Sequence, residues 1–309
     1  MTFWNETDAI VESVGNALWR ARAKHNSLGV SGEEVVKKNQ FGDTAVRADI
    51  ECEEAVFEAL KTWKFVEIAM PPVRVVSEEH GIVDIGENPR YTGILDGLDG
   101  SSVYKQARTC GGRYGTMFAV LNGTDPFYRD YVASGVIEYS KERLLNLQSV
   151  ASTTFLYFTA KGNGRTYCED DPGDLGREWR VQTSRNNVLT SSSMIYIDTF
   201  SKWERETLSK LSKDFPKIGK NGLGSSAIFY VDLITGKTDV VIECTRKKNL
   251  EIGVAYGLVR GAGGVMVDID GNDLGEKKYL EWGQNEELPV ISAANMELAR
   301  QMINVLKSI

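Results

Sequence analysis

A short acidic segment in the first half of the chain has the residue types of a metal and phosphate site. Two carboxylates three residues apart, Asp96 and Asp99, follow an apolar run, and Gly100, Ser101 and Ser102 come directly after them. Hard cations such as Mg²⁺ prefer carboxylate and carbonyl oxygens and often bind phosphate-bearing substrates. A glycine-serine turn can hold a phosphate with its backbone N–H groups, particularly where a helix begins. Metal ligands beside an anion site indicate phosphoryl chemistry.

A second acidic pair, Glu78-Glu79, also follows a short apolar run, at residues 73–76. Acidic groups that meet at the ends of neighbouring strands repel one another unless a cation neutralises them. Leu98, between the two aspartates, offers a backbone carbonyl as a further ligand. The alternative is that these acids are ordinary turn residues, since Asp and Gly are common where strands end.

Composition excludes several classes of function. The chain has 309 residues, of which 42% are hydrophobic, enough for one large domain or two closely packed ones. Its net charge of -7 argues against a nucleic-acid polymer or a membrane surface as partner. Only two histidines occur, which disfavours a multi-histidine metal site or a histidine-dependent triad.

The expected compartment is the cytoplasm. The first eight residues lack a secretory signal pattern, and no apolar run approaches the roughly 20 residues that span a bilayer. The four cysteines lie far apart without C-x-x-C spacing, which disfavours structural zinc or a disulfide framework.

The pattern of elements predicts an α+β fold. Helical periodicity covers residues 8–21, 48–63, 202–215, 226–235, 251–260 and 295–309, and apolar runs typical of strands cover 73–76, 91–95, 114–121, 131–139, 194–197, 238–243 and 265–269. These elements mix without regular β-α-β alternation, which indicates a layered arrangement. Residues 37–43 and 169–180 are predicted as loops. The glycine-containing region 161–185 is the expected boundary between two units, 1–185 and 186–309.

Five segments together resemble one family. Residues 76–79 and 96–102 resemble the signature of the metal-dependent, lithium-sensitive phosphatases, which include the inositol monophosphatases and the fructose-1,6-bisphosphatases. Residues 43–49 resemble the early D-x-V-T-x-x-D element of these enzymes, 161–164 their K-G-x-G turn, and 251–264 their late acidic and Ala-Gly-Gly element. The segments occur in family order, which makes the joint match specific.

The resemblance implies a layered α-β-α-β-α sandwich and a set of metal ligands. Glu78, Asp96 and the Leu98 carbonyl would hold one Mg²⁺ ion, and Asp96, Asp99 and Glu251 a second. Two or three ions are expected, with Mn²⁺ as a substitute. For Glu251 the alternative is that an acid simply favours the first turn of a helix.

The resemblance also implies catalytic and phosphate-binding roles. Asp49 and Ser101 would orient and activate the attacking water, and Glu79 would lie next to these groups and help to position them. Gly100, Ser101 and Ser102 would present backbone N–H groups to the phosphate. A metal-assisted reaction of this kind needs no histidine base.

Features of the two branches are mixed in this chain. Leu250-Glu251 stands where inositol monophosphatases have Trp-Asp, and Ala255-Tyr256 and Ser101-Ser102 fit the bisphosphatases better. Residues 224–227 resemble a monophosphatase element. Gly97 replaces a proline common to both branches and is expected to loosen the turn.

The predicted function is therefore a Mg²⁺-dependent phosphomonoesterase that resembles an inositol-1-phosphatase, with fructose-1,6-bisphosphate hydrolysis as an additional activity to test. The alternatives are a dedicated fructose-1,6-bisphosphatase, a nucleotide 3′-phosphatase, a non-catalytic phosphosugar or metal binder, and a glycosidase with paired acids. The expected partners are a small phosphorylated sugar, cyclitol or nucleotide and a second copy of the chain in a homodimer. The basic run 246–248 either holds a second phosphate or forms a solvated face.

Overall fold

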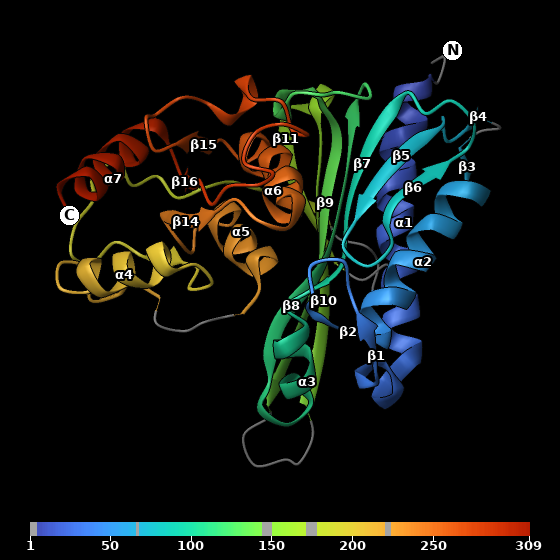
Figure 1. Cartoon of the computed structure of the whole chain (residues 1–309), viewed down its shortest axis with the longest axis horizontal. Coiled ribbons are helices and arrows are strands. Elements are labelled where there is room, and N and C mark those ends of the chain that lie inside the picture. Colours follow the sequence, from blue (N-terminus) through green and yellow to red (C-terminus); the bar gives the residue numbers. More distant parts are fainter. Residues whose placement is uncertain (1–4, 66–67, 144–149, 171–177, 220–223) are drawn as a thin grey trace.

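The fold is an α+β sandwich of alternating helical and sheet layers (Figure 1). The computed structural model describes residues 5–65, 68–143, 150–170, 178–219 and 224–309. A large sheet of eight strands forms the centre, in the order β12-β11-β10-β9-β8-β7-β5-β6. Its strands are β5 (Val73–Ser77), β6 (Gly81–Ile85), β7 (Tyr91–Asp99), β8 (Gly112–Asn122), β9 (Tyr131–Arg143), β10 (Val150–Ala160), β11 (Arg165–Asp170) and β12 (Glu178–Val181).

One pair in this sheet matters most for the acidic residues. β5 and β7 are parallel and Ser77 pairs with Leu95, so the next residues of the two strands, Glu78 and Asp96, follow at the same edge. The other neighbours in the large sheet pair antiparallel.

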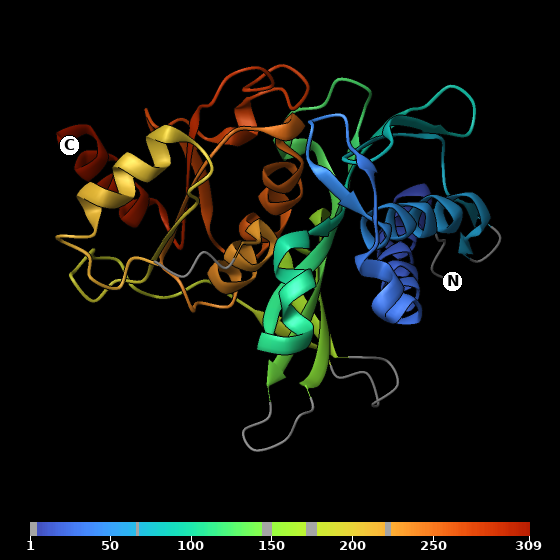
Figure 2. The ribbon, with the colours of Figure 1, turned by 60° about the horizontal axis from the view of Figure 1, so that its bottom comes forward.

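Helices cover both faces of the large sheet. α1 (Glu6–Leu28) and α2 (Arg47–Thr62) lie together on one face (Figure 2), where α1 packs on β8 and β9 and α2 on β7. Apolar side chains of the two helices, such as Ile10, Leu18 and Val56, are buried in the core there. α5 (Ser226–Ile234) and α6 (Leu250–Gly261) lie on the other face. Every residue of α5 is buried, because this helix lies between two sheets.

The second sheet has the order β13-β14-β16-β15. Its strands are β13 (Ile195–Ile197), β14 (Val240–Cys244), β15 (Val265–Asp268) and β16 (Pro289–Ala293), and α4 (Lys202–Leu211) and α7 (Met296–Ser308) cover its outer face. The remaining elements are α3 (Ser101–Cys110) and two small hairpins, β1 (Val35–Lys38) with β2 (Thr44–Val46) and β3 (Lys64–Phe65) with β4 (Ile68–Ala69). The resulting order of layers is helix, sheet, helix, sheet, helix, as predicted.

Two predicted loops need correction. β1 extends to Lys38, two residues into the segment 37–43. β11 and β12 occupy both ends of the segment 169–180, and residues 178–180 of β12 are exposed at the edge of the large sheet, while 171–177 lies outside the described residues. The large sheet ends at Val181 and the small sheet begins at Ile195. The division into units 1–185 and 186–309 stays a prediction.

Candidate active site

Three buried carboxylates form the centre of the site. Asp96, Asp99 and Glu251 each present an oxygen within 4.8 Å of the other two. Successive side chains of a strand point to opposite faces, so a spacing of three would separate the aspartates. β7 avoids this separation through a bulge. Asp96 pairs with Met117 and Asp99 with Gly115, so β7 has one residue more than β8 between these pairs, and both carboxylates reach one cluster.

Gly97, inside the bulge, lies against the first turn of α2. A Cβ atom at this position would be 2.4 Å from the Asp49 carbonyl oxygen and 2.7 Å from Glu53 Cγ. The Gly97 carbonyl also accepts a hydrogen bond from the Thr116 hydroxyl at 2.7 Å. The structure therefore gives Gly97 a packing role, because only a residue without a side chain lets β7 approach α2 so closely.

Asp99 is fixed by the start of α5. Its Oδ2 accepts a hydrogen bond from the Ser225 hydroxyl at 2.5 Å and another from the Ala227 backbone N–H at 2.6 Å. Sequence analysis missed this anchor, although the Gly-Ser-Ser sequence at 224–226 predicted the start of the helix. Because both bonds go to one oxygen, Oδ1 remains for the cluster.

Asp49 and Glu79 each keep one buried oxygen without a partner. Asp49 Oδ2 accepts the Val46 backbone N–H at 2.7 Å, while Oδ1 has no hydrogen-bond partner among the described residues. Glu79 Oε1 accepts from Asn39 Nδ2 at 3.1 Å, and its Oε2 is likewise unpaired in that part of the chain. Burial raises the pKa of Asp49 to about 8 and that of Glu79 to about 7.

These carboxylates fit a hard divalent cation. Burial, followed by the charges of Glu78, Asp99 and Glu251, raises the pKa of Asp96 well above its ordinary value. Burial and the charge of Glu251 raise the pKa of Asp99 to about 7. Crowded acids of this kind are stable only when protonated or neutralised by a cation. Oxygen donors without sulfur or imidazole suit Mg²⁺, Mn²⁺ or Ca²⁺.

The residues predicted to bind the phosphate lie where α3 begins. Gly100 has a left-handed conformation (φ 93°), and a Cβ atom there would be 2.8 Å from Ser225 Cβ. Ser101 and Ser102 are the first residues of α3. Backbone N–H groups in the first turn of a helix have no partner within it and favour anions.

Glu251 lies in the first turn of α6, where the helix dipole favours an acid. Glu251 can therefore be both a favourable acid at a helix start and a metal ligand, since the start of α6 brings it to Asp96 and Asp99.

The basic run before α6 divides between the site and solvent. Lys247 Nζ lies 2.8 Å from Glu78 Oε1 and 2.8 Å from Asp43 Oδ2. Arg246 Nη2 lies 2.9 Å from Asp198 Oδ2 and 3.9 Å from Glu251 Oε1. Lys248 is exposed. The expectation that the basic run forms a solvated face therefore holds for Lys248, whereas Arg246 and Lys247 lie in the site.

The backbone of this run is unusual. Lys247, Lys248 and Asn249 all have positive φ angles, of 44°, 63° and 54°. A left-handed conformation costs a non-glycine residue roughly 1–2 kcal/mol. The Asn249 side chain secures the turn: its Oδ1 accepts the Arg246 backbone N–H at 3.0 Å, and its Nδ2 donates to the Trp282 carbonyl at 2.8 Å.

All the predicted site residues line one open cavity of about 440 Å³. The set comprises Asp49, Glu78, Glu79, Asp96, Leu98, Asp99, Gly100, Ser101, Ser102 and Glu251. Asn39, Asp43, Lys105, Arg246 and Lys247 line it as well.

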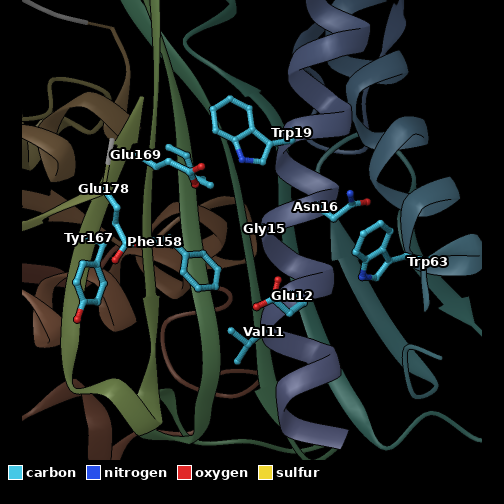
Figure 3. Close-up of a pocket in the computed structure, with 11 residues that line it drawn as sticks. Val11, Glu12, Gly15, Asn16, Trp19, Trp63, Phe158, Tyr167, Glu169 and Glu178 are labelled. Atoms are coloured by element: carbon cyan, nitrogen blue, oxygen red, sulfur yellow. The ribbon is translucent and has the colours of Figure 1, made fainter. Parts of the chain in front are cut away.

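A second hollow of about 480 Å³ lies elsewhere, along α1. Aromatic rings and carboxylates line it, including Trp19, Trp63, Glu12 and Glu169 (Figure 3). Its described lining contains none of the predicted site residues, and it lacks a basic group for a phosphate.

The comparisons with known proteins decide the family. The model of the inositol monophosphatase family matches residues 6–304. The chain belongs to the inositol monophosphatase family. Members of this family are metal-dependent phosphomonoesterases that act on small phosphorylated substrates, so the chain is an enzyme of this class. The glycosidase and the non-catalytic binder, two of the alternatives from the sequence, are therefore both wrong.

Solved structures share the fold at low sequence identity. The IMPase of Thermotoga maritima has a TM-score of 0.66 at 14% identity and covers 96% of this chain and 97% of its own. The holo form of Leishmania major fructose-1,6-bisphosphatase has a TM-score of 0.65 at 14% identity, with 98% and 95% covered. The extragenic suppressor protein suhB of Bartonella henselae has a TM-score of 0.63 at 16% identity, with 96% and 98% covered.

No curated protein sequence matches the chain. Among the residues that the structure describes, no helix is both long enough and apolar enough to cross a membrane.

Proposed function

We propose that this enzyme is a Mg²⁺-dependent phosphomonoesterase for a small sugar or cyclitol phosphate and that its active site is the cavity around Asp96. The observation that carries the proposal is the carboxylate cluster of Asp96, Asp99 and Glu251 beside the start of α3. A cation site next to free backbone N–H groups is what hydrolysis of a phosphate monoester needs.

The cations would be held by residues from several elements. Asp96, Asp99 and Glu251 would hold one ion, and Glu78, Asp96 and the Leu98 carbonyl another. We propose two or three Mg²⁺ ions, which Mn²⁺ can replace. When bound, they neutralise charge on the phosphoryl group and increase the acidity of water.

The chain itself would bind the phosphate and take up a proton. Backbone N–H groups at Gly100, Ser101 and Ser102 would bind phosphoryl oxygens at the start of α3. Asp49 lines the same cavity, and its Oδ1 is free to accept a proton from the attacking water while Ser101 orients that water. Asn39 holds one Glu79 oxygen, which would keep Glu79 directed at these groups.

The substrate is open within the family. Lys105, Arg246 and Lys247 line the cavity and would suit a second phosphate. This feature favours fructose-1,6-bisphosphate as a further substrate beside inositol-1-phosphate, as in a dedicated fructose-1,6-bisphosphatase. A nucleotide 3′-phosphatase of the same family is the remaining alternative.

The test is phosphate release from inositol-1-phosphate, fructose-1,6-bisphosphate and adenosine 3′,5′-bisphosphate, each with Mg²⁺ and with EDTA. We expect one substrate to dominate by kcat/KM and EDTA to abolish its hydrolysis. Asp96→Asn tests the assigned ligand, because it keeps the side-chain volume but removes the charge, and it should lower kcat by orders of magnitude. Release that survives EDTA or Asp96→Asn would refute the assignment, and binding of all three esters without release would show that the substrate is another phosphate ester.

Three broader expectations belong to the same proposal. The homodimer and the cytoplasmic compartment rest on family resemblance and on the spacing of the cysteines. Inhibition by Li⁺ rests on resemblance as well. The units 1–185 and 186–309 are supported by the separate large and small sheets.

A further inference from the structure

A lysine lies inside the acidic cavity. Lys247 Nζ is 2.8 Å from both Glu78 Oε1 and Asp43 Oδ2, and its side chain is only 19% exposed. A largely buried ammonium group is stable only when it is paired, and these two carboxylates supply the pair.

Glu78 therefore already has hydrogen-bond partners in the metal-free protein. Its Oε1 accepts hydrogen bonds from Lys247 Nζ at 2.8 Å and from Asn39 Nδ2 at 3.1 Å. Among the described residues, the carboxylates close enough to share one ion are Asp96, Asp99 and Glu251, a set that does not include Glu78. The family resemblance, in contrast, makes Glu78 a metal ligand.

The backbone holds Lys247 in this place. Lys247 begins three consecutive residues of positive φ, and the Asn249 side chain secures the turn at both ends through Arg246 and Trp282. The turn sends Lys247 into the cavity and leaves Lys248 exposed. A positive φ is unfavourable for a lysine, and here it places the Lys247 ammonium group against two carboxylates, which offset its cost.

We propose that Lys247 is a resident cation that competes with a divalent ion for Glu78. The inner group Asp96, Asp99 and Glu251 then binds one ion tightly, and the ion at Glu78 binds weakly because Lys247 must first be displaced. This inference rests on the proposed function. A charge-assisted hydrogen bond is worth enough to make the difference about tenfold to a hundredfold in affinity.

The experiment titrates metal-free protein with Mn²⁺ in the absence of substrate and follows free Mn²⁺ by electron paramagnetic resonance. Wild type should show a tight and a weak class of site. Lys247→Met should tighten the weak class about tenfold or more and change the tight class much less. Lys247→Arg keeps the charge and should retain the difference between the classes.

Lys248→Met is the matched control, because it removes the same charge from the neighbouring exposed residue. It should leave both classes as in wild type. Thermal unfolding checks that each variant is folded, and Lys247→Gln replaces the methionine variant if that variant does not fold.

The outcomes separate this inference from the proposed function. Equal weak-class affinity in wild type and Lys247→Met would overturn the role of Lys247 and leave the phosphatase proposal standing, as would an effect of Lys248→Met of the same size. No Mn²⁺ binding to wild type or to Lys247→Met would refute the metal-dependent site itself, and the inference would fall with it.

Discussion

The acidic centre depends on one extra residue in β7. Without the bulge between Asp96 and Asp99, strand geometry would direct their carboxylates to opposite faces of the sheet. With it, one face of the sheet edge carries both, and the close contact of Gly97 with α2 brings Asp49 alongside. The proposed metal site and the packing of β7 against α2 therefore depend on the same bulge.

We expect Gly97→Ala to destabilise the enzyme and weaken metal binding. The added Cβ would be 2.4 Å from the Asp49 carbonyl oxygen, which is backbone and cannot rotate away. The cost should be about 1–3 kcal/mol of unfolding free energy, as for overpacked cores. Urea unfolding with and without Mg²⁺ measures it.

Gly15→Ala is the control for this prediction. Gly15 lies within α1, and a Cβ there would meet nothing within 4 Å. Alanine should stabilise that helix by up to about 1 kcal/mol. Equal effects of the two alanine substitutions would contradict the packing role of Gly97.

Three helices begin at the cavity. α3 starts at Ser101, α5 at Ser226 and α6 at Leu250, and residues at or beside each start line the cavity or contact its carboxylates. The positive ends of their dipoles face the acids, which stabilises the carboxylates before any cation binds. The helices act as positioning elements as much as the strands do.

We expect Ser225→Ala to weaken divalent-cation binding about tenfold while the protein stays folded, because a charge-assisted hydrogen bond is worth roughly 1.5–3 kcal/mol. The substitution removes the 2.5 Å bond to Asp99 Oδ2 and lets that carboxylate rotate. Calorimetric titration with Mg²⁺ measures the change.

Ser184→Ala is the matched control, since the Ser184 hydroxyl also binds an aspartate, Asp239, at 2.6 Å, and neither residue lines the site cavity. It should leave Mg²⁺ affinity unchanged. A similar loss of affinity in both serine variants would show that the effect is global and not due to Asp99.

At the scale of elements, periodicity predicted most of the helices, including α2, α6 and α7 within a few residues, but it missed several strands of the two main sheets, such as β6, β10 and β16. It could not reveal the bulge, since a spacing of three looks the same with or without an extra residue. Nor could it predict the turn at Lys247, because lysine carries no signal for a positive φ. The anchor from Ser225 to Asp99 joins residues 126 positions apart, which only tertiary packing brings together.

At the scale of the whole molecule, a neutral histidine, His25, is buried in the core between α1 and the large sheet. His25 stacks on Tyr139 with ring centroids 4.0 Å apart, and its Nε2 lies 3.2 Å from the Tyr114 hydroxyl. Burial lowers the pKa of His25 to about 4. His80 has the opposite environment, because its hydrogen bond to Glu53 at 2.7 Å raises its pKa.

These two histidines should affect acid stability in opposite directions. Between pH 6.5 and about 4 the unfolded chain protonates His25 while the folded chain does not, so acidification lowers the unfolding free energy, by on the order of 3 kcal/mol. His25→Phe should therefore make the unfolding free energy fall less steeply on acidification. His80 binds its proton more tightly when folded, so its contribution is present at low pH and is lost as pH rises through its raised pKa. His80→Gln should therefore steepen the loss of stability on acidification. Urea unfolding at several pH values, with EDTA throughout, measures both slopes, and equal slopes for the two variants would contradict the buried neutral state of His25.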